Sequence, residues 1–115
     1  MISKNNEVTL IGNIGAEPKV IDKNDKLFVV FSLATQDSYK DDNDEWQKKD
    51  PIWHNNLLAF NTSAINKAKE LSKGERIRIT GSLSYRPFET TIDGDKTVNK
   101  NEASIIVASI EKAPL

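Results

Sequence analysis

Cysteine is absent from this chain of 115 residues, and histidine occurs once, as His54. A disulfide scaffold, a thiolate metal site, a cysteine nucleophile and any mechanism that needs two histidines are therefore excluded. The longest apolar run, from Leu27 to Phe31, is five residues long, whereas a membrane-spanning helix needs about 20. The first six residues lack the apolar core of a signal peptide. We therefore expect a cytoplasmic protein with no membrane association.

The chain also lacks a strong net charge. Its 16 Lys and Arg balance 17 Asp and Glu, for a formal net charge of −1, which excludes a polycation of the histone-like kind. The layout is uneven, because all three arginines (Arg76, Arg78 and Arg86) lie within eleven residues, whereas residues 36–50 hold six acids against three lysines. These local balances, more than the total, determine which partners the surface attracts.

Alternating apolar and polar residues predict five main strands, and helical spacing predicts one helix. The strands are expected at 8–14, 27–39, 52–60, 75–86 and 104–110, and the helix at 62–73. Thr62 or Ser63 is expected to cap the helix and Gly74 to end it. Pro87 is expected to interrupt the fourth strand, and Asp93-Gly94 predicts a short hairpin over 88–98. Residues 40–50 are expected to form a polar loop around Trp46.

This order of elements is that of an OB-fold, an all-β five-stranded Greek-key barrel with one short helix between strands 3 and 4. We expect a single domain over residues 1–112, followed by a short C-terminal stub over 113–115. No internal repeat or low-complexity segment competes with this interpretation.

The residues give no enzyme signature and no cofactor motif. Asp41, Asn43 and Glu45 have the alternate spacing of a calcium loop, but Trp46 stands where that loop needs glycine and Ile52 where it needs glutamate. We therefore expect neither a metal nor a catalytic site.

A combination of aromatic and basic residues is the stronger signal. Rings that stack on bases, together with cations that follow the phosphates, are typical of single-stranded nucleic-acid binding. Core packing is the alternative for each ring, and a solvated strand face is the alternative for the arginines. The candidate binding residues are Tyr39, Lys40, Trp46, Lys48, Lys49, Trp53, Phe60, Lys73, Arg78, Tyr85, Arg86 and Phe88.

Several fragments, in this order and spacing, resemble the bacterial single-stranded DNA-binding protein family from about Asn6 to Ile110. They are Val-Thr-Leu-Ile-Gly-Asn-Ile-Gly-Ala-Glu-Pro-Lys-Val (8–20), Phe-Ser-Leu-Ala-Thr (31–35) with Ser38-Tyr39, Trp53-His54, Leu-Ser-Lys-Gly (71–74) and Ile-Thr-Gly-Ser-Leu (79–83). The resemblance implies an OB-fold, commonly a homotetramer, that coats single-stranded DNA in replication, recombination and repair without changing it chemically. It also implies a place at the nucleoid.

The resemblance assigns roles to matching positions. Tyr39 stands where the family has a stacking tryptophan, and Trp53 matches its second one. Phe60 and Phe88 match further aromatic platforms. Two basic residues, Lys73 and Arg86, match positions that contact the backbone of the DNA.

The chain also departs from the family. Residues 53–60 are one residue longer than the pattern, so either Trp53 or Phe60 changes face or a bulge absorbs the extra residue. Asn55-Asn56 and Asn61-Thr62 replace places where the family often has cations, which should weaken binding and flatten its salt dependence. The sequence ends without the family's acidic tail, so we expect either a tailless member or a shortened form of a longer chain. Tail-mediated recruitment of proteins is not carried over.

Two binding functions remain as alternatives. A primosomal replication protein N-like accessory would bind DNA as a dimer and bridge replication proteins. A protein-interaction module would have kept the barrel and lost DNA binding, in line with the net charge and the missing cations. A small hydrolase is the enzyme alternative, which the lack of catalytic groups disfavours.

Overall fold

The computed structural model describes residues 5–92, 94 and 96–113, and within these the side chains of residues 88, 90–92 and 96–98 are left undescribed. Residues 1–4, Asp93 of the predicted turn and the last two residues of the predicted stub lie outside this description. The elements are β1 (Val8–Ile14), β2 (Lys19–Lys23), β3 (Lys26–Thr35), β4 (Ser38–Lys40), β5 (Trp46–Lys48), β6 (Ile52–Ala59), α1 (Thr62–Lys69), β7 (Arg76–Ile92) and β8 (Lys96–Lys112).

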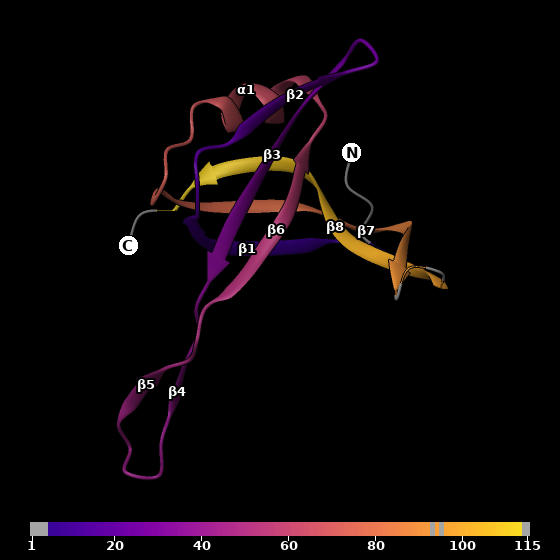
Figure 1. The fold of residues 1–115 in the computed structure, drawn as a ribbon. Coiled ribbons are helices and arrows are strands. Elements are labelled where there is room, and N and C mark those ends of the chain that lie inside the picture. Colours follow the sequence, from indigo (N-terminus) through magenta and orange to yellow (C-terminus); the bar gives the residue numbers. More distant parts are fainter. Residues whose placement is uncertain (1–4, 93, 95, 114–115) are drawn as a thin grey trace.

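Five of these strands close into a ring. The main sheet runs β1-β7-β8-β6-β3-β2, and an additional pairing of β1 with β3 closes it. The β6–β8 pair is parallel, whereas the other pairs in the ring are antiparallel. The helix α1 lies between the third and fourth members of the ring in chain order and covers one end of it (Figure 1). The predicted five-stranded barrel with one helix is therefore confirmed.

The interior of the ring is filled by alternate residues of its strands, as the sequence pattern predicts. Val29, Phe31 and Leu33 of β3 are buried, as are Ile77 and Ile79 of β7. The helix adds Ala64, Ile65 and Ala68 from one face. Burying these apolar side chains is the main source of the barrel's stability.

The ring closes where the backbones of β1 and β3 approach each other closely. A Cβ atom at Gly12 would overlap the carbonyl oxygen of Ala34, just where β1 reaches β3. Glycine is needed here because no side chain fits between the two backbones.

The β2 strand was not predicted. It pairs with β3 through a two-residue turn in which Asn24 and Asp25 both have positive φ, at 53° and 63°. Such a turn matches the twist of a hairpin, and Asn and Asp tolerate this backbone conformation better than most residues. The short strand before the turn is largely exposed, so it lacks the apolar pattern that marks the other strands.

The helix begins at a different cap from the one predicted. Asn61 accepts a hydrogen bond from the backbone N–H of Ala64 at 2.7 Å, so the cap is Asn61 rather than Thr62 or Ser63. The helix is also shorter than predicted and ends at Lys69 with Glu70 as its C-cap. Gly74, at φ 88°, serves the turn that follows.

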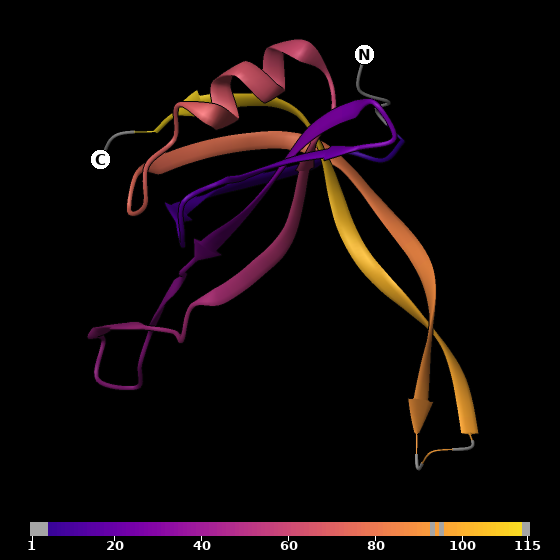
Figure 2. The ribbon, with the colours of Figure 1, turned by 45° about the horizontal axis from the view of Figure 1, so that its top comes forward.

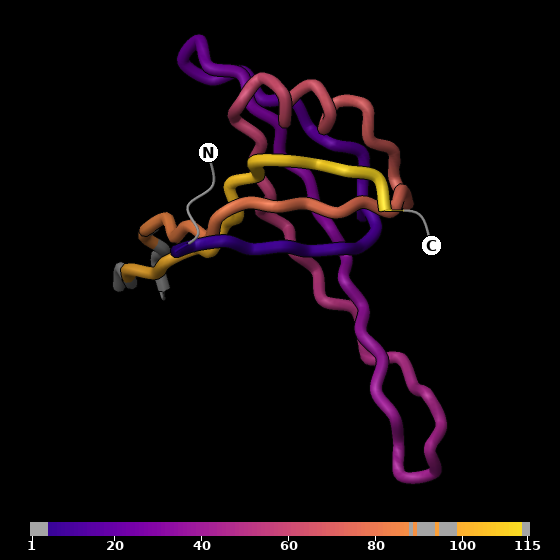
Figure 3. The backbone as a smooth tube through the Cα atoms, turned by 180° about the vertical axis from the view of Figure 1, so that it is seen from behind, coloured from indigo at the N-terminus to yellow at the C-terminus, as the bar shows by residue number. Residues whose placement is uncertain are grey.

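Besides the β2–β3 hairpin, two longer hairpins project from the barrel (Figures 2 and 3). One is the outer part of β7 and β8, whose pairing continues without a break through Pro87, so the predicted interruption is wrong. The other is β4–β5, where the predicted long strand breaks at Gln36-Asp37 and the predicted loop forms a short two-stranded sheet. The radius of gyration of 16.8 Å reflects these projections, since a compact chain of this length has about 13 Å.

Candidate nucleic-acid interface

A β-bulge in β6 determines which way Trp53 faces. Leu57 pairs with Phe31, but Trp53 pairs with Ala34, so the register shifts by one residue between these pairs. Residues directly opposite each other in a sheet share a face. The shift therefore moves Trp53 off the core face of Leu57 and onto the outer face of Leu58 and Phe60. The extra residue noted in the sequence at 53–60 is therefore accommodated by a β-bulge.

The ring of Trp53 lies against Gly15, the residue that follows β1. Trp53 is 54% exposed, and a Cβ atom at Gly15 would overlap its six-membered ring and the hydroxyl of Ser32. The absence of a side chain at Gly15 thus lets the indole lie close against the backbone. The ring keeps an exposed surface on which a base could stack.

A groove of about 500 Å³ follows the outer face of the sheet. Its apolar floor comes from four strands and the residue after β6, and consists of Ile21, Phe28, Val30, Leu58, Phe60 and Ile106. Its more polar wall comes from the β7–β8 hairpin and Asn56, and consists of Asn56, Ser84, Tyr85, Arg86, Pro87, Glu102 and Ser104. A second hollow of about 290 Å³ contains Trp53 and shares Asn56 and Ser104 with the groove.

Phe60 forms a supported platform in the groove floor. Its ring is 48% exposed and packs against Phe28 with centroids 5.2 Å apart and an angle of 33° between the planes. A partner ring fixes the orientation of an exposed phenylalanine. Phe60 thus packs on Phe28 and is also half exposed, and its role as a base platform stays a prediction.

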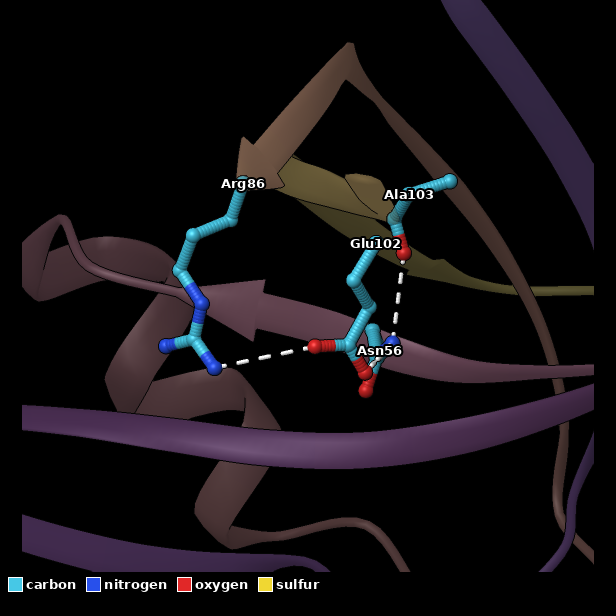
Figure 4. Close-up of polar contacts among 4 residues, drawn as sticks. All are labelled: Asn56, Arg86, Glu102 and Ala103. Atoms are coloured by element: carbon cyan, nitrogen blue, oxygen red, sulfur yellow. Dashed lines mark hydrogen bonds and ion pairs between the residues drawn. The ribbon is translucent and has the colours of Figure 1, made fainter. Parts of the chain in front are cut away.

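Arg86 is held by a short polar network in the groove wall (Figure 4). Its Nη2 lies 3.6 Å from Oε2 of Glu102. The other carboxylate oxygen, Oε1, accepts a hydrogen bond of 2.8 Å from the side-chain amide of Asn56, which also donates to the carbonyl of Ala103 at 3.2 Å. The Arg86 side chain is 78% exposed, so the guanidinium is accessible to a ligand.

The β4–β5 hairpin carries Tyr39 and Trp46 on opposite faces. Trp46 pairs directly with Lys40 and shares a strand face with Lys48, while Tyr39 pairs with Gln47. Trp46 is 70% exposed. One face of this hairpin therefore combines a ring with two cations.

Asp41 organises the turn of this hairpin. Its Oδ1 accepts hydrogen bonds from the backbone N–H groups of Asn43 and Glu45, both at 2.9 Å, and its Oδ2 accepts one from the side chain of Gln47 at 3.1 Å. The bond from Glu45 is the largest cause that lowers the pKa of Asp41, with smaller contributions from Gln47 and Asn43, and partial desolvation opposes them. The carboxylate of Asp41 thus serves as an acceptor within the turn.

The other candidates lie further from the groove. Arg78 is exposed on the barrel wall beside Ile11 and Glu111, about 26 Å along β7 from Arg86 at about 3.3 Å per residue. Lys49 is exposed and follows β5. Lys73 is exposed in the turn after α1, and the next residue in that turn donates a backbone hydrogen bond to Ile14, the neighbour of Gly15. The Phe88 side chain lies outside the described structure.

The candidates therefore fall into three groups. Phe60, Tyr85 and Arg86 meet at the groove, with Trp53 in the adjoining hollow. Tyr39, Lys40, Trp46 and Lys48 belong to the β4–β5 hairpin. The third group, Lys49, Lys73 and Arg78, is scattered over the surface.

Sequence reasoning missed the groove floor and the acid in its wall. Phe28 and Val30 alternate with the buried Val29 and Phe31 of β3, and an apolar second face of this kind is a usable signal. Nothing in the local sequence pointed to Glu102 or to its contact with Asn56, 46 residues away.

The closed five-membered ring with its helix between the third and fourth strands makes this an OB-fold protein. The model of the single-strand binding protein family matches residues 5–112. The chain belongs to this family.

Relatives and solved structures agree with this membership. The chain is 32% identical over 93 residues to the mitochondrial single-stranded DNA-binding protein of Drosophila melanogaster, covering 80% of this chain and 62% of that protein. It is 33% identical over 86 residues to the single-stranded DNA-binding protein of Staphylococcus epidermidis, covering 73% and 61%. The match thus covers about three fifths of each of these relatives. The structure of the Plasmodium falciparum SSB complex with ssDNA has a TM-score of 0.78 at 28% identity and covers 99% of this chain and 100% of that one.

None of the described residues forms a helix with the length and hydropathy of a membrane span.

Proposed function

We propose that this chain binds single-stranded DNA without sequence preference, through base stacking in the groove and phosphate contacts along its wall. The observation that carries the proposal is the groove itself, which combines the supported platform of Phe60 with the accessible guanidinium of Arg86. Stacking tolerates any base because every base has a π-face, and cations follow the backbone whatever its sequence.

The β4–β5 hairpin extends this interface in the proposal. Trp46, flanked by Lys40 and Lys48 on one face, offers the same pairing of ring and cation as the groove. Tyr39 on the opposite face, with Lys49, Lys73, Arg78 and Phe88, stays a predicted contact. Family membership supports this assignment, as does the likeness to a relative solved with single-stranded DNA.

The wider role follows from the same membership. We propose protection of single-stranded DNA during replication, recombination or repair, with no chemical change to the DNA, by a homotetramer associated with the nucleoid. The dimeric, primosomal replication protein N-like accessory is not favoured, because the comparisons are with single-stranded DNA-binding proteins.

Titration with oligo-dT of graded length tests the proposal. We expect quenching of tryptophan fluorescence, affinity that falls as salt rises, and little binding to a duplex of the same length. The mass of the protein in solution, measured in the same samples, should be four times that of one chain. Absence of quenching and of a gel shift at low salt would refute DNA binding, and a dimeric mass would refute the tetramer alone.

A further inference from the structure

Glu102 is an unexpected residue for a groove that receives a polyanion. Among the described residues that line the groove, Arg86 and Glu102 are the two that carry a charge. They are of opposite sign and face each other. A carboxylate at this position repels phosphate and occupies the one arginine of the wall, so its presence calls for a physical account.

The two partners differ in how firmly they are held. The Glu102 carboxylate is anchored through Oε1 to the amide of Asn56 at 2.8 Å, and that amide is itself fixed to the carbonyl of Ala103. The Glu102 side chain is 41% exposed, whereas the Arg86 side chain is 78% exposed and lies 3.6 Å from the Glu102 carboxylate. Because the acid is fixed and the guanidinium is open, Arg86 can turn away while Glu102 stays in place.

The anchor depends on the bulge in β6. Asn56 lies between the pairs Phe31–Leu57 and Leu33–His54, where β6 has one residue more than β3. The side chain of this irregular segment reaches across to β8. The bulge that turns Trp53 outward thus also includes the residue whose amide orients Glu102.

We propose that Glu102 is a built-in competitor of the DNA backbone: it occupies Arg86 in the free protein and must be displaced before Arg86 contacts a phosphate. The inference rests on the proposed function and deepens it. Carboxylate and phosphate bind the guanidinium fork through the same donors, so one replaces the other. An ion pair as exposed as this one adds little to the stability of the fold, which makes competition a better account of Glu102 than structural support.

The competition has a signature in the salt dependence of binding. Each phosphate neutralised by a cation releases counterions, so affinity falls with salt in proportion to the number of such contacts. When phosphate displaces Glu102, the freed carboxylate attracts a cation and cancels part of that release. Glu102 should therefore lower the affinity and flatten the salt dependence together.

The test compares E102Q with D22N in oligo-dT titrations over a range of salt. Glutamine keeps the acceptor for Asn56 but removes the charge. Asp22 is exposed on β2, next to the groove residue Ile21 but on the opposite strand face, so D22N makes the same change in net charge outside the groove. We expect E102Q to bind about three- to tenfold more tightly than D22N at low salt, with a slope steeper by up to about 0.7, the value for one phosphate contact on a single strand.

A double-mutant cycle separates competition from general repulsion. In an R86Q background there is no guanidinium to compete for, so E102Q should improve affinity by less than about twofold. Thermal unfolding of each variant confirms that the fold is unchanged. Equal affinities and slopes for E102Q and D22N, in a protein whose wild type binds, would overturn the inference. So would an undiminished effect of E102Q in the R86Q background. A wild-type chain that does not bind at low salt would instead overturn the proposed function, and this inference with it.

Discussion

The two projecting hairpins differ in how they are joined to the barrel. The β7–β8 hairpin is made of strands of 17 residues each, whose inner halves are walls of the ring. The β4–β5 hairpin has strands of three residues each, separated from β3 and β6 by short segments outside the strands. Its base is held by hydrogen bonds from the Lys49 N–H to the Asp37 carbonyl at 2.8 Å and from the Gln36 side chain to the Lys49 carbonyl at 2.9 Å.

Because of this difference, we expect the two hairpins to have different roles in stability and binding. Because its strands continue those of the barrel, the β7–β8 hairpin has a fixed position relative to the barrel. It therefore forms a fixed wall of the groove that contains Phe60. The β4–β5 hairpin depends on local contacts such as those of Asp41, and its position is less strictly determined by the core. We expect the first hairpin to be coupled to the stability of the fold and the second to contribute to binding alone.

The largest effect is expected at Gly81, where the β7–β8 hairpin leaves the barrel. A Cβ atom there would overlap the carbonyl oxygen of Ile106, at the point where the register of the pair shifts. G81V should therefore lower the free energy of unfolding by about 3 kcal/mol or more. Chemical denaturation measures the loss. An unchanged midpoint would mean that the hairpin is not coupled to the barrel.

Shortening the other hairpin is the matched comparison. Replacing Asp41 to Glu45 by Asn-Gly joins the paired residues Lys40 and Trp46 through a two-residue turn. Because surface loops contribute little to stability, the free energy of unfolding should change by less than about 1 kcal/mol. A loss as large as that of G81V would contradict the distinction between the two hairpins.

The two tryptophans of the chain report on the two regions separately. W53A should weaken binding to oligo-dT by about 1–3 kcal/mol, the range for loss of one stacked base, and W46A by less. In fluorescence titrations, W46F should keep most of the quenching, since Trp53 remains, whereas W53F should lose most of it. The reverse result would make the β4–β5 hairpin, and not the groove region, the main stacking site.

The smallest effect is expected from acid at the β4–β5 turn. The pKa of Asp41 is lowered in the folded state, chiefly by the N–H of Glu45, so its stabilising effect is present above the ordinary pKa of about 3.9 and is lost as the pH falls through the lowered value. The fluorescence of Trp46 in a W53F background should then change in acid before the barrel unfolds. D41N keeps one acceptor oxygen but does not titrate, so an identical acid profile in D41N would rule out Asp41 as the cause.

The barrel could be predicted because alternation and order are local signals. Val29, Phe31 and Leu33 alternate along the predicted strand and are all buried, and the last predicted strand, which is apolar at most of its positions, is paired on both sides. Pro87 misled the prediction because β1 pairs with β7 only as far as Gly81. Beyond that point the Asn6 side chain bonds the backbone of Leu83, and at Pro87 β8 is the one strand that pairs with β7 in the described structure, as suits a proline at a sheet edge.

The site was predictable only in part. Aromatic and basic residue types indicated single-stranded DNA, but the pairing of Phe28 with Phe60 and of Asn56 with Glu102 depends on strands brought together by the barrel. The sequence showed one extra residue in 53–60 but left open how it is accommodated, because the position of the bulge is set by the pairing of β6 with β3. The roles of the individual binding residues stay predictions until the variants are measured.

The bulge at Asn55-Asn56 also has a consequence for comparing this chain with its relatives. A relative that lacks the extra residue needs an alignment gap here, in the middle of a strand, where gaps are usually avoided. If the gap is instead placed in the segment between β5 and β6, residues 52–54 are aligned one position away from their structural equivalents. Residues that face the core are then aligned with residues that face outward. The structure places the gap at this bulge, which keeps Trp53 on the exposed face of the sheet and out of the core.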